Sequence, residues 1–394
     1  MEPVMKKTLL RWSSLVAIAS VALTGCAGPP KSTGPTYTIA YEGPLSGAGS
    51  LLSASMQNGV RLAVEEANAK GDLSFTLGYL PLDDQGKRAR AADAARKAIT
   101  DPTVVAVVGP TLSSTTEASS ALYAEAELAT VTPTATAPQL TDPRNNFGSL
   151  LRAVPHDGAQ GAGMATYYAR RTGAQKVYLI DDGTVYGKNL ADVAQTSLTS
   201  AAIDVIRVGV PRGTPDYTAT ARAVVASRTK ALIYAGSYQD LAPLAKKLRE
   251  AGYTGAGISG DGANDKSFVD LAGEAAENWF LTCPCVDATR EKATQRFAAA
   301  YTKRFGTTPG AYAAESYDVT NMIIATLRKT VGKTDPKALR STLLKNLASA
   351  EYTGLTKVYA FDEKGEFRGS GVSLYQVKNG VITYQGNIDR LADR

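Results

Sequence analysis

The 394-residue chain is poor in the side chains that most enzyme sites need, with one histidine, His156, and three cysteines. A histidine-based triad would have to include His156, and a metal site would need further ligands at a matching spacing, which His156 lacks. The sequence also contains no G-x-S-x-G elbow, no P-loop and no H-E-x-x-H motif. We therefore predict a protein without enzyme activity, bound metal or cofactor.

Long hydrophobic runs are absent except for a short one near the N-terminus, at residues 13–23. Lys6, Lys7 and Arg11 precede this run, which is too short for a stable membrane anchor and is typical of a secretory signal peptide. An A-x-A-like cleavage site is missing, and the tetrapeptide LTGC follows instead, ending at Cys26. This tetrapeptide resembles the lipobox of bacterial lipoproteins, which implies cleavage before Cys26 and diacylglyceryl attachment there. The alternative, an uncleaved membrane helix, is disfavoured by the length of the run.

A strong excess of charge is also absent. The net charge of +6 falls to +4 when the three basic residues and one acidic residue of the predicted signal peptide are removed, and no polybasic run occurs. Nucleic acid is therefore not an expected partner.

The two remaining cysteines, Cys283 and Cys285, flank a single proline. They allow a strained disulfide, two buried thiols or half of a metal site. We favour a structural role and leave their redox state open.

Short apolar runs alternate with longer helical patterns beyond a tether at residues 27–36, which is rich in Pro, Gly, Ser and Thr. This alternation predicts an α/β fold with parallel, doubly wound sheets. Two successive runs of about five strand–helix units each predict two similar lobes, divided near residues 154–157.

Two polar loops in one stretch of the sequence have the pattern of a binding site. The apolar run Val104–Val108 is followed by a serine/threonine cluster that opens a helical pattern, and a second apolar run at 128–131 ends in the polar loop 132–136. Both loops then lie at the carboxyl ends of neighbouring parallel strands, where open α/β sheets bind ligands. The helix N-terminus suits a carboxylate. A plainer alternative is a capping box of Ser114 and Glu117 that closes an ordinary helix.

The glycines at residues 255–260 match the dinucleotide motif G-x-G-x-x-G. That motif requires glycines that follow a strand and open a helix, whereas these follow a predicted helix at 241–251 and continue into a loop. We therefore do not predict dinucleotide binding.

Polar and aromatic residues follow other predicted strands as well. Each has an ordinary structural role, because tyrosines pack, aspartates form turns, and serines and threonines cap helices. Their shared position at strand ends in both lobes nevertheless predicts a ligand site. They are Ser113, Thr134, Thr136, Tyr186, Tyr238 and Asp261.

From residue 37 to the C-terminus the chain resembles the type I periplasmic solute-binding proteins of ABC transporters, specifically the Leu/Ile/Val-binding group. The resemblance implies two Rossmann-like lobes joined by three crossovers. It rests on the order of motifs at residues 41–47, 108–115, 132–138, 181–187, 236–238 and 361–365. The implied crossovers lie near 154–156, 282–285 and 353–356. The implied segments are 1–25 (signal peptide), 26–36 (lipidated Cys26 and tether), 37–154 with 285–353 (first lobe) and 156–282 with 357–394 (second lobe).

The resemblance also implies roles for individual residues. In the family, residues matching Ser113 and Thr136 hold the ligand carboxylate, while the carbonyl at Thr134 and the acid matching Asp261 hold the ammonium. Ala135 lies in the same loop, and aromatics matching Tyr186 and Tyr238 close over the ligand. Leu52 stands where some relatives carry a pocket tyrosine, and Tyr312 occupies an aromatic pocket position. Because Asp261 is shorter than the glutamate common in relatives, the ammonium must sit closer or be bridged by water.

We therefore predict an extracytoplasmic lipoprotein, anchored to the cell membrane at Cys26. It binds a small aliphatic amino acid, such as a branched-chain one, by hinge closure and delivers it to an ABC permease. The alternatives are an amide, urea-like or aromatic-acid ligand on the same fold, or a ligand sensor. The sequence does not identify which amino acid is bound.

Overall fold

The computed structural model describes residues 34–47, 49–142, 144, 148–331 and 336–392. The predicted signal peptide and the lipidation site Cys26 lie outside these residues. Within the described ranges no helix is both long enough and apolar enough to cross a membrane.

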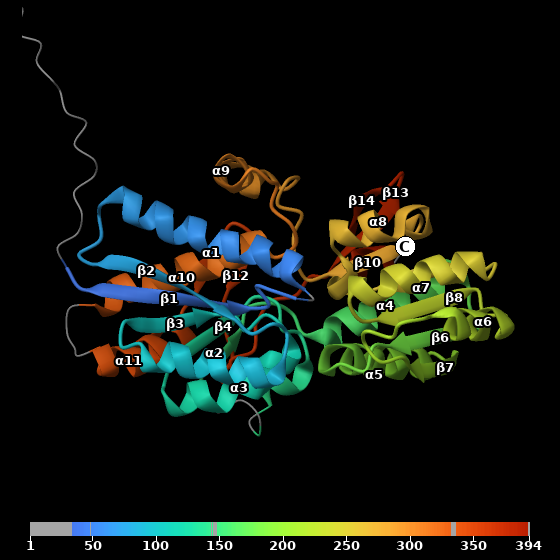
Figure 1. The fold of residues 1–394 in the computed structure, drawn as a ribbon, viewed down its shortest axis with the longest axis horizontal. Coiled ribbons are helices and arrows are strands. Elements are labelled where there is room, and N and C mark those ends of the chain that lie inside the picture. The colour runs from blue at the N-terminus through green and yellow to red at the C-terminus, as the bar shows by residue number, and fades with distance from the viewer. Residues whose placement is uncertain (1–33, 48, 143, 145–147, 332–335, 393–394) are drawn as a thin grey trace, which may run out of the picture.

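The first lobe is built on a parallel sheet with the strand order β2-β1-β3-β4-β5. Helices α1 and α10 cover one face, and α2 and α3 cover the other (Figure 1). Because both faces are covered, the central strand β3 is a continuous buried apolar run, VVAVV. The elements are β1 (Thr36–Gly43), α1 (Ser50–Lys70), β2 (Thr76–Asp83), α2 (Arg88–Thr100), β3 (Val104–Val108), α3 (Ser113–Glu125), β4 (Ala129–Thr132) and β5 (Leu150–Arg152).

The second lobe is built on a seven-stranded sheet with the order β14-β13-β10-β9-β8-β6-β7. Strand β13 runs antiparallel to its neighbours β10 and β14, and the other pairs are parallel. The strands are β6 (Lys176–Asp181), β7 (Asp204–Gly209), β8 (Ala231–Ala235), β9 (Ala256–Ser259), β10 (Phe280–Cys283), β13 (Ser373–Lys378) and β14 (Val381–Asn387). The helices are α4 (Asp157–Thr172), α5 (Val185–Ser200), α6 (Thr218–Ala226), α7 (Tyr238–Glu250), α8 (Lys266–Ala272) and α12 (Ile388–Ala392).

The chain passes between the two sheets three times: after β5, after β10 and before β13. The segment between the last two passages returns to the first lobe, where α10 packs along α1 and α11 packs against β3. This segment contains α9 (Gln295–Phe305), α10 (Ala313–Thr330), α11 (Pro336–Ala348), β11 (Tyr352–Thr353) and β12 (Val358–Tyr359). The predicted α/β fold of two doubly wound lobes is confirmed. The residue boundaries of the lobes that the sequence analysis gives stay a prediction.

The second passage contains a disulfide between Cys283 and Cys285. Both side chains are buried, and the Tyr375 hydroxyl donates to the Cys285 carbonyl over 3.2 Å. Of the alternatives that the sequence allows, the structure therefore has the disulfide.

Candidate ligand-binding site

A cavity between the two lobes brings together most of the residues predicted to bind ligand. Ala135 and Thr136 are buried beside this cavity without lining it. The predicted residues that line it are Leu52, Ser113, Thr134 and Tyr312 from the first lobe, and Tyr186, Tyr238 and Asp261 from the second.

The N-terminus of α3 forms part of the first-lobe wall. Gly109, with φ of +119°, turns the chain after β3 so closely that a Cβ there would lie 2.4 Å from the Glu42 carbonyl oxygen. Helix α3 then begins at Ser113 without a side-chain cap. The N–H groups of Ser113 and Ser114 consequently have no partner among the described residues.

The alternative of a capping box formed by Ser114 and Glu117 is wrong. Residue Leu112 occupies the N-cap position of α3 and offers no side-chain acceptor. Glu117 instead forms an ion pair with Arg88 of α2, which lies beside α3. The first-turn N–H groups are therefore left for another acceptor.

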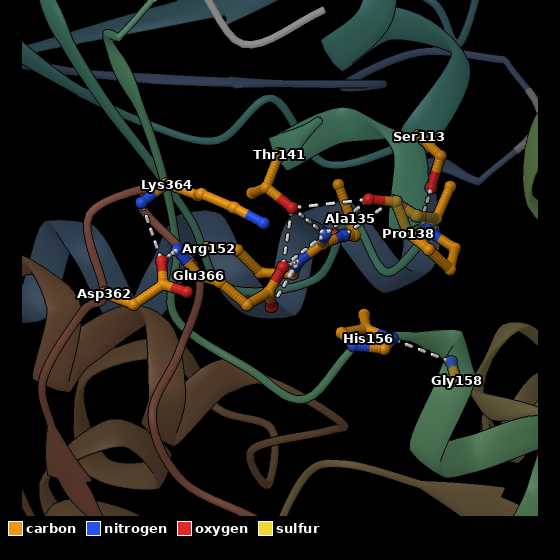
Figure 2. Close-up of polar contacts among 11 residues, drawn as sticks. Ser113, Ala135, Pro138, Thr141, Arg152, His156, Gly158, Asp362, Lys364 and Glu366 are labelled. Carbon is orange, nitrogen blue, oxygen red and sulfur yellow. Dashed lines mark hydrogen bonds and ion pairs between the residues drawn. The ribbon is translucent and has the colours of Figure 1, made fainter. Parts of the chain in front are cut away.

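The loop after β4 lies next to this helix N-terminus. The Ser113 hydroxyl accepts a bond of 3.3 Å from the Ala137 N–H (Figure 2), which leaves its own proton to donate. The Thr134 hydroxyl donates to the Thr111 carbonyl over 2.7 Å. Within the described chain, the Thr134 carbonyl, the Thr136 N–H and the Thr136 hydroxyl have no hydrogen-bond partner. The loop thus offers both an acceptor and donors at one place.

The second-lobe wall is centred on Asp261, which follows β9 and is buried. Its Oδ1 accepts from Gln160 Nε2 over 2.7 Å and from the Tyr186 hydroxyl over 2.8 Å. Its Oδ2 accepts from the Tyr312 hydroxyl over 2.7 Å, a bond that joins the two lobes. Burial raises the pKa of the Asp261 carboxyl, and these three neutral donors offset only part of that effect.

Two residues around Asp261 have constrained geometry. Tyr312 adopts a left-handed backbone with φ of 61°, which is unfavourable for a bulky side chain, and this conformation precedes α10. Gly260 is packed so tightly that a Cβ would lie 2.3 Å from the Tyr186 hydroxyl and 2.6 Å from Gln160 Nε2. The glycine at the end of the G-x-G-x-x-G match therefore serves this close packing.

A second buried carboxylate, Asp157, lies in the first turn of α4. It is 0% exposed, its N–H donates to the Thr136 carbonyl over 2.8 Å, and its carboxyl lies beside the Thr136 hydroxyl. Burial raises the pKa of the Asp157 carboxyl well above its ordinary value, and the negative charge of Asp261 adds to this. Two carboxyls whose charges destabilise each other in a buried site favour a cation between or beside them.

Comparisons with known proteins agree with this architecture. A family model for periplasmic binding proteins matches residues 36–381. The chain belongs to the periplasmic binding protein family. Members of this family bind solutes outside the cytoplasm and are not enzymes, so this periplasmic binding protein has a solute-binding role.

Three relatives illustrate the range of similarity. A Leu/Ile/Val-binding protein from Rhizobium johnstonii is 28% identical over 88% of this chain and 92% of its own length. The leucine-binding protein LivK from Thermotoga maritima has a TM-score of 0.80 at 24% identity, covering 89% of this chain and 98% of that one. A solute-binding protein from R. palustris in complex with benzoate has a TM-score of 0.79 at 16% identity, covering 90% and 96%. The two structural matches establish the fold.

Sequence reasoning missed several residues at the site of this periplasmic binding protein. Asp182 and Arg212 line the cavity just after β6 and β7, so the strand-end rule applied to every strand would have found them. Asp157 and Gln160 were also missed, although they stand three residues apart in the helix that follows the first crossover. Residues three apart lie on one face of a helix, and this helix begins at a predicted crossover, so the pair could have been predicted to face the ligand site.

His156 is half-buried at the N-cap of α4. Its Nδ1 accepts from the Gly158 N–H over 2.9 Å (Figure 2), and burial lowers its pKa. Among the described residues no group of three or more His, Cys, Asp and Glu side chains could hold a metal ion.

Proposed function

We propose that this periplasmic binding protein captures a small aliphatic α-amino acid between its lobes and delivers it to an ABC permease. The ligand is held in the cavity by Ser113, Thr134, Thr136 and Asp261. We further propose that the protein acts outside the cytoplasm as a lipoprotein anchored to the membrane at Cys26, as the LTGC tetrapeptide implies.

One observation carries the proposal: the unpartnered N–H groups at the start of α3 and the buried carboxyl of Asp261 belong to the lining of a single cavity. The free N–H groups at the start of α3 and at Thr136 suit a carboxylate. Asp261, which lines the same cavity from the second lobe, suits an ammonium. A zwitterion loses hydration at both ends when it enters such a cavity, so it binds only where both charges find partners.

The bond between Tyr312 and Asp261 supports closure of the lobes around the ligand. The two residues belong to different lobes, and their 2.7 Å contact requires the lobes to be close together. The proposed hinge segments are the three passages of the chain between the sheets, with the lobe boundaries that the sequence predicts.

The names of relatives support an aliphatic side chain for the ligand, since they are Leu/Ile/Val-binding proteins. The relative in complex with benzoate supports a second candidate, an aromatic acid on the same fold. Asp261 separates the two candidates, because an aromatic acid has no ammonium to neutralise the buried carboxyl. Amides and urea-like solutes are further alternatives for the same reason.

A thermal-shift screen against leucine, isoleucine, valine, benzoate, acetamide and urea tests the proposal. A solute at 100 times its dissociation constant adds about 2.7 kcal/mol to the free energy of unfolding. We expect a shift with at least one of the three amino acids. A shift with benzoate or an amide alone would replace the amino acid by that class of ligand.

A further inference from the structure

Arg152, the last residue of β5, has a fully buried side chain in the first lobe. Its Nη1 donates to the carbonyl of Ala135 over 3.0 Å and to that of Ala137 over 2.7 Å. Its Nη2 donates to the Pro138 carbonyl over 3.3 Å (Figure 2). One guanidinium therefore holds three carbonyl groups of the loop that follows β4.

The other side of this guanidinium is held by Glu366, from the third passage of the chain. Nε of Arg152 donates to Oε1 over 2.9 Å, and Nη2 donates to Oε2 over 2.8 Å. Nη2 also donates to the Thr141 hydroxyl over 2.8 Å, and that hydroxyl donates to Glu366 over 2.6 Å. The five N–H groups of the arginine fork reach all these acceptors from one side chain, with the longer Nη2 contact to Pro138 sharing a hydrogen, and the compact ammonium of a lysine cannot do the same.

Among the described residues Arg152 is the one partner of the Ala135 carbonyl, whereas the Ala137 carbonyl also accepts from the Leu140 N–H and the Pro138 carbonyl from the Thr141 hydroxyl. The carbonyls of Ala135, Ala137 and Pro138 are occupied by the guanidinium, and the Thr136 carbonyl accepts from the Asp157 N–H over 2.8 Å. Within the described chain, only the Thr134 carbonyl is left without a partner between residues 134 and 138. Thr134 is also the residue of this loop that lines the cavity.

We propose that Arg152, braced by Glu366, is a positioning residue for ligand binding. It fixes the peptide planes of the loop so that the Thr134 carbonyl meets the ligand. This inference rests on the proposed function, because it takes the loop after β4 to be part of the ligand site. Arg152 itself does not line the cavity.

Arg340 offers a matched control. It is another largely buried arginine that donates to three backbone carbonyls, those of Ile99, Asp101 and Val104. These carbonyls lie at or before the start of β3, whereas the ligand loops follow the strand ends. Loss of Arg340 therefore removes the same kind of interaction without touching the loop after β4.

The test compares Arg152→Lys, Arg152→Met and Glu366→Gln with Arg340→Met. The dissociation constant is measured by calorimetry at a temperature where circular dichroism shows each variant fully folded, and Tm is measured separately. We expect Arg152→Lys to weaken binding at least tenfold, Glu366→Gln to weaken it in the same direction, and Arg340→Met to lower Tm with binding within twofold of wild type. If Arg152→Met fails to fold, the other two site variants decide.

A fall in Tm for Arg152→Lys and Glu366→Gln with dissociation constants within twofold of wild type would overturn the inference, because it would show a purely structural role. Leucine is the probe, or benzoate where the wild type binds only benzoate. Failure of the wild type to bind any amino acid counts against the proposed function alone, since the inference is judged on the ratio of variant to wild type.

Discussion

Replacing Asp261 by asparagine removes one negative charge from the cavity while leaving its hydrogen bonds in place. The asparagine Oδ1 keeps the bonds from Gln160 and Tyr186, and its NH₂ group donates to the Tyr312 hydroxyl, which turns from donor to acceptor. The fold of the site is thus preserved. What changes is the partner offered to the ligand ammonium.

The magnitude follows from the burial of the carboxylate. An ammonium in hydrogen-bonding contact with Asp261 gains about 4 kcal/mol at an effective dielectric constant near 20. A hydrogen bond to a charged group is worth about 1.5–3 kcal/mol in mutational series. We therefore expect Asp261→Asn to cost about 2–4 kcal/mol of binding free energy, which weakens the dissociation constant about 30-fold to about 1,000-fold.

Isothermal titration calorimetry with the amino acid found by the thermal-shift screen measures this loss. Asp216→Asn is the matched control, because Asp216 is an exposed carboxylate of the second lobe whose hydrogen bonds, among the described residues, go to Thr218. The control should bind as wild type does. A change of less than threefold for Asp261→Asn would refute the assignment of Asp261 to the ammonium.

Four further predictions concern pH, the packing of Gly260 and the lipid anchor. Because the pKa values of Asp157 and Asp261 are raised, the affinity for an amino acid should fall as the pH drops through the titration of these carboxyls. Binding should therefore release protons, which calorimetry in buffers of different ionisation enthalpy measures. Proton uptake on binding would contradict this prediction. The stability of the unliganded protein should depend on pH in the opposite direction. Because the pKa values of these carboxyls are higher in the folded protein than in the unfolded chain, acidification through their titration should raise Tm. Gly260→Ala should lower the free energy of unfolding by about 1–3 kcal/mol, because its Cβ would meet the Tyr186 hydroxyl at 2.3 Å; an unchanged Tm would argue against this packing. Mass analysis of the mature protein should find acyl chains on Cys26 that are absent from Cys26→Ser, and an unmodified Cys26 would refute the anchor.

Much of the site could be predicted because its residues share one position in the fold, just after the carboxyl ends of strands. Ser113 and Thr134 follow β3 and β4, and Asp261 follows β9, so the carboxyl ends of parallel strands bring them to the same cavity. This rule needs only the alternation of strands and helices, which the sequence displays directly. Applied to every strand, it also finds Asp182 and Arg212.

The remaining features depend on contacts between residues far apart in the sequence. Arg152 and Glu366 lie 214 residues apart in the sequence, and no local pattern connects them. The capping-box alternative is wrong for a similar reason, because Glu117 forms an ion pair with Arg88 of a neighbouring helix. The left-handed backbone of Tyr312 is likewise imposed by its surroundings rather than by its residue type.

The described chain starts in one lobe and finishes in the other. Strand β1 begins at Thr36 in the first sheet, while α12 packs against α4 on the second lobe, near the C-terminus marked in Figure 1. A lipid at Cys26 would therefore hold the first lobe to the bilayer and leave the second lobe to swing. Fluorophores attached near residue 36 and residue 392 would report that swing as a change in energy transfer, without a probe inside the ligand cavity.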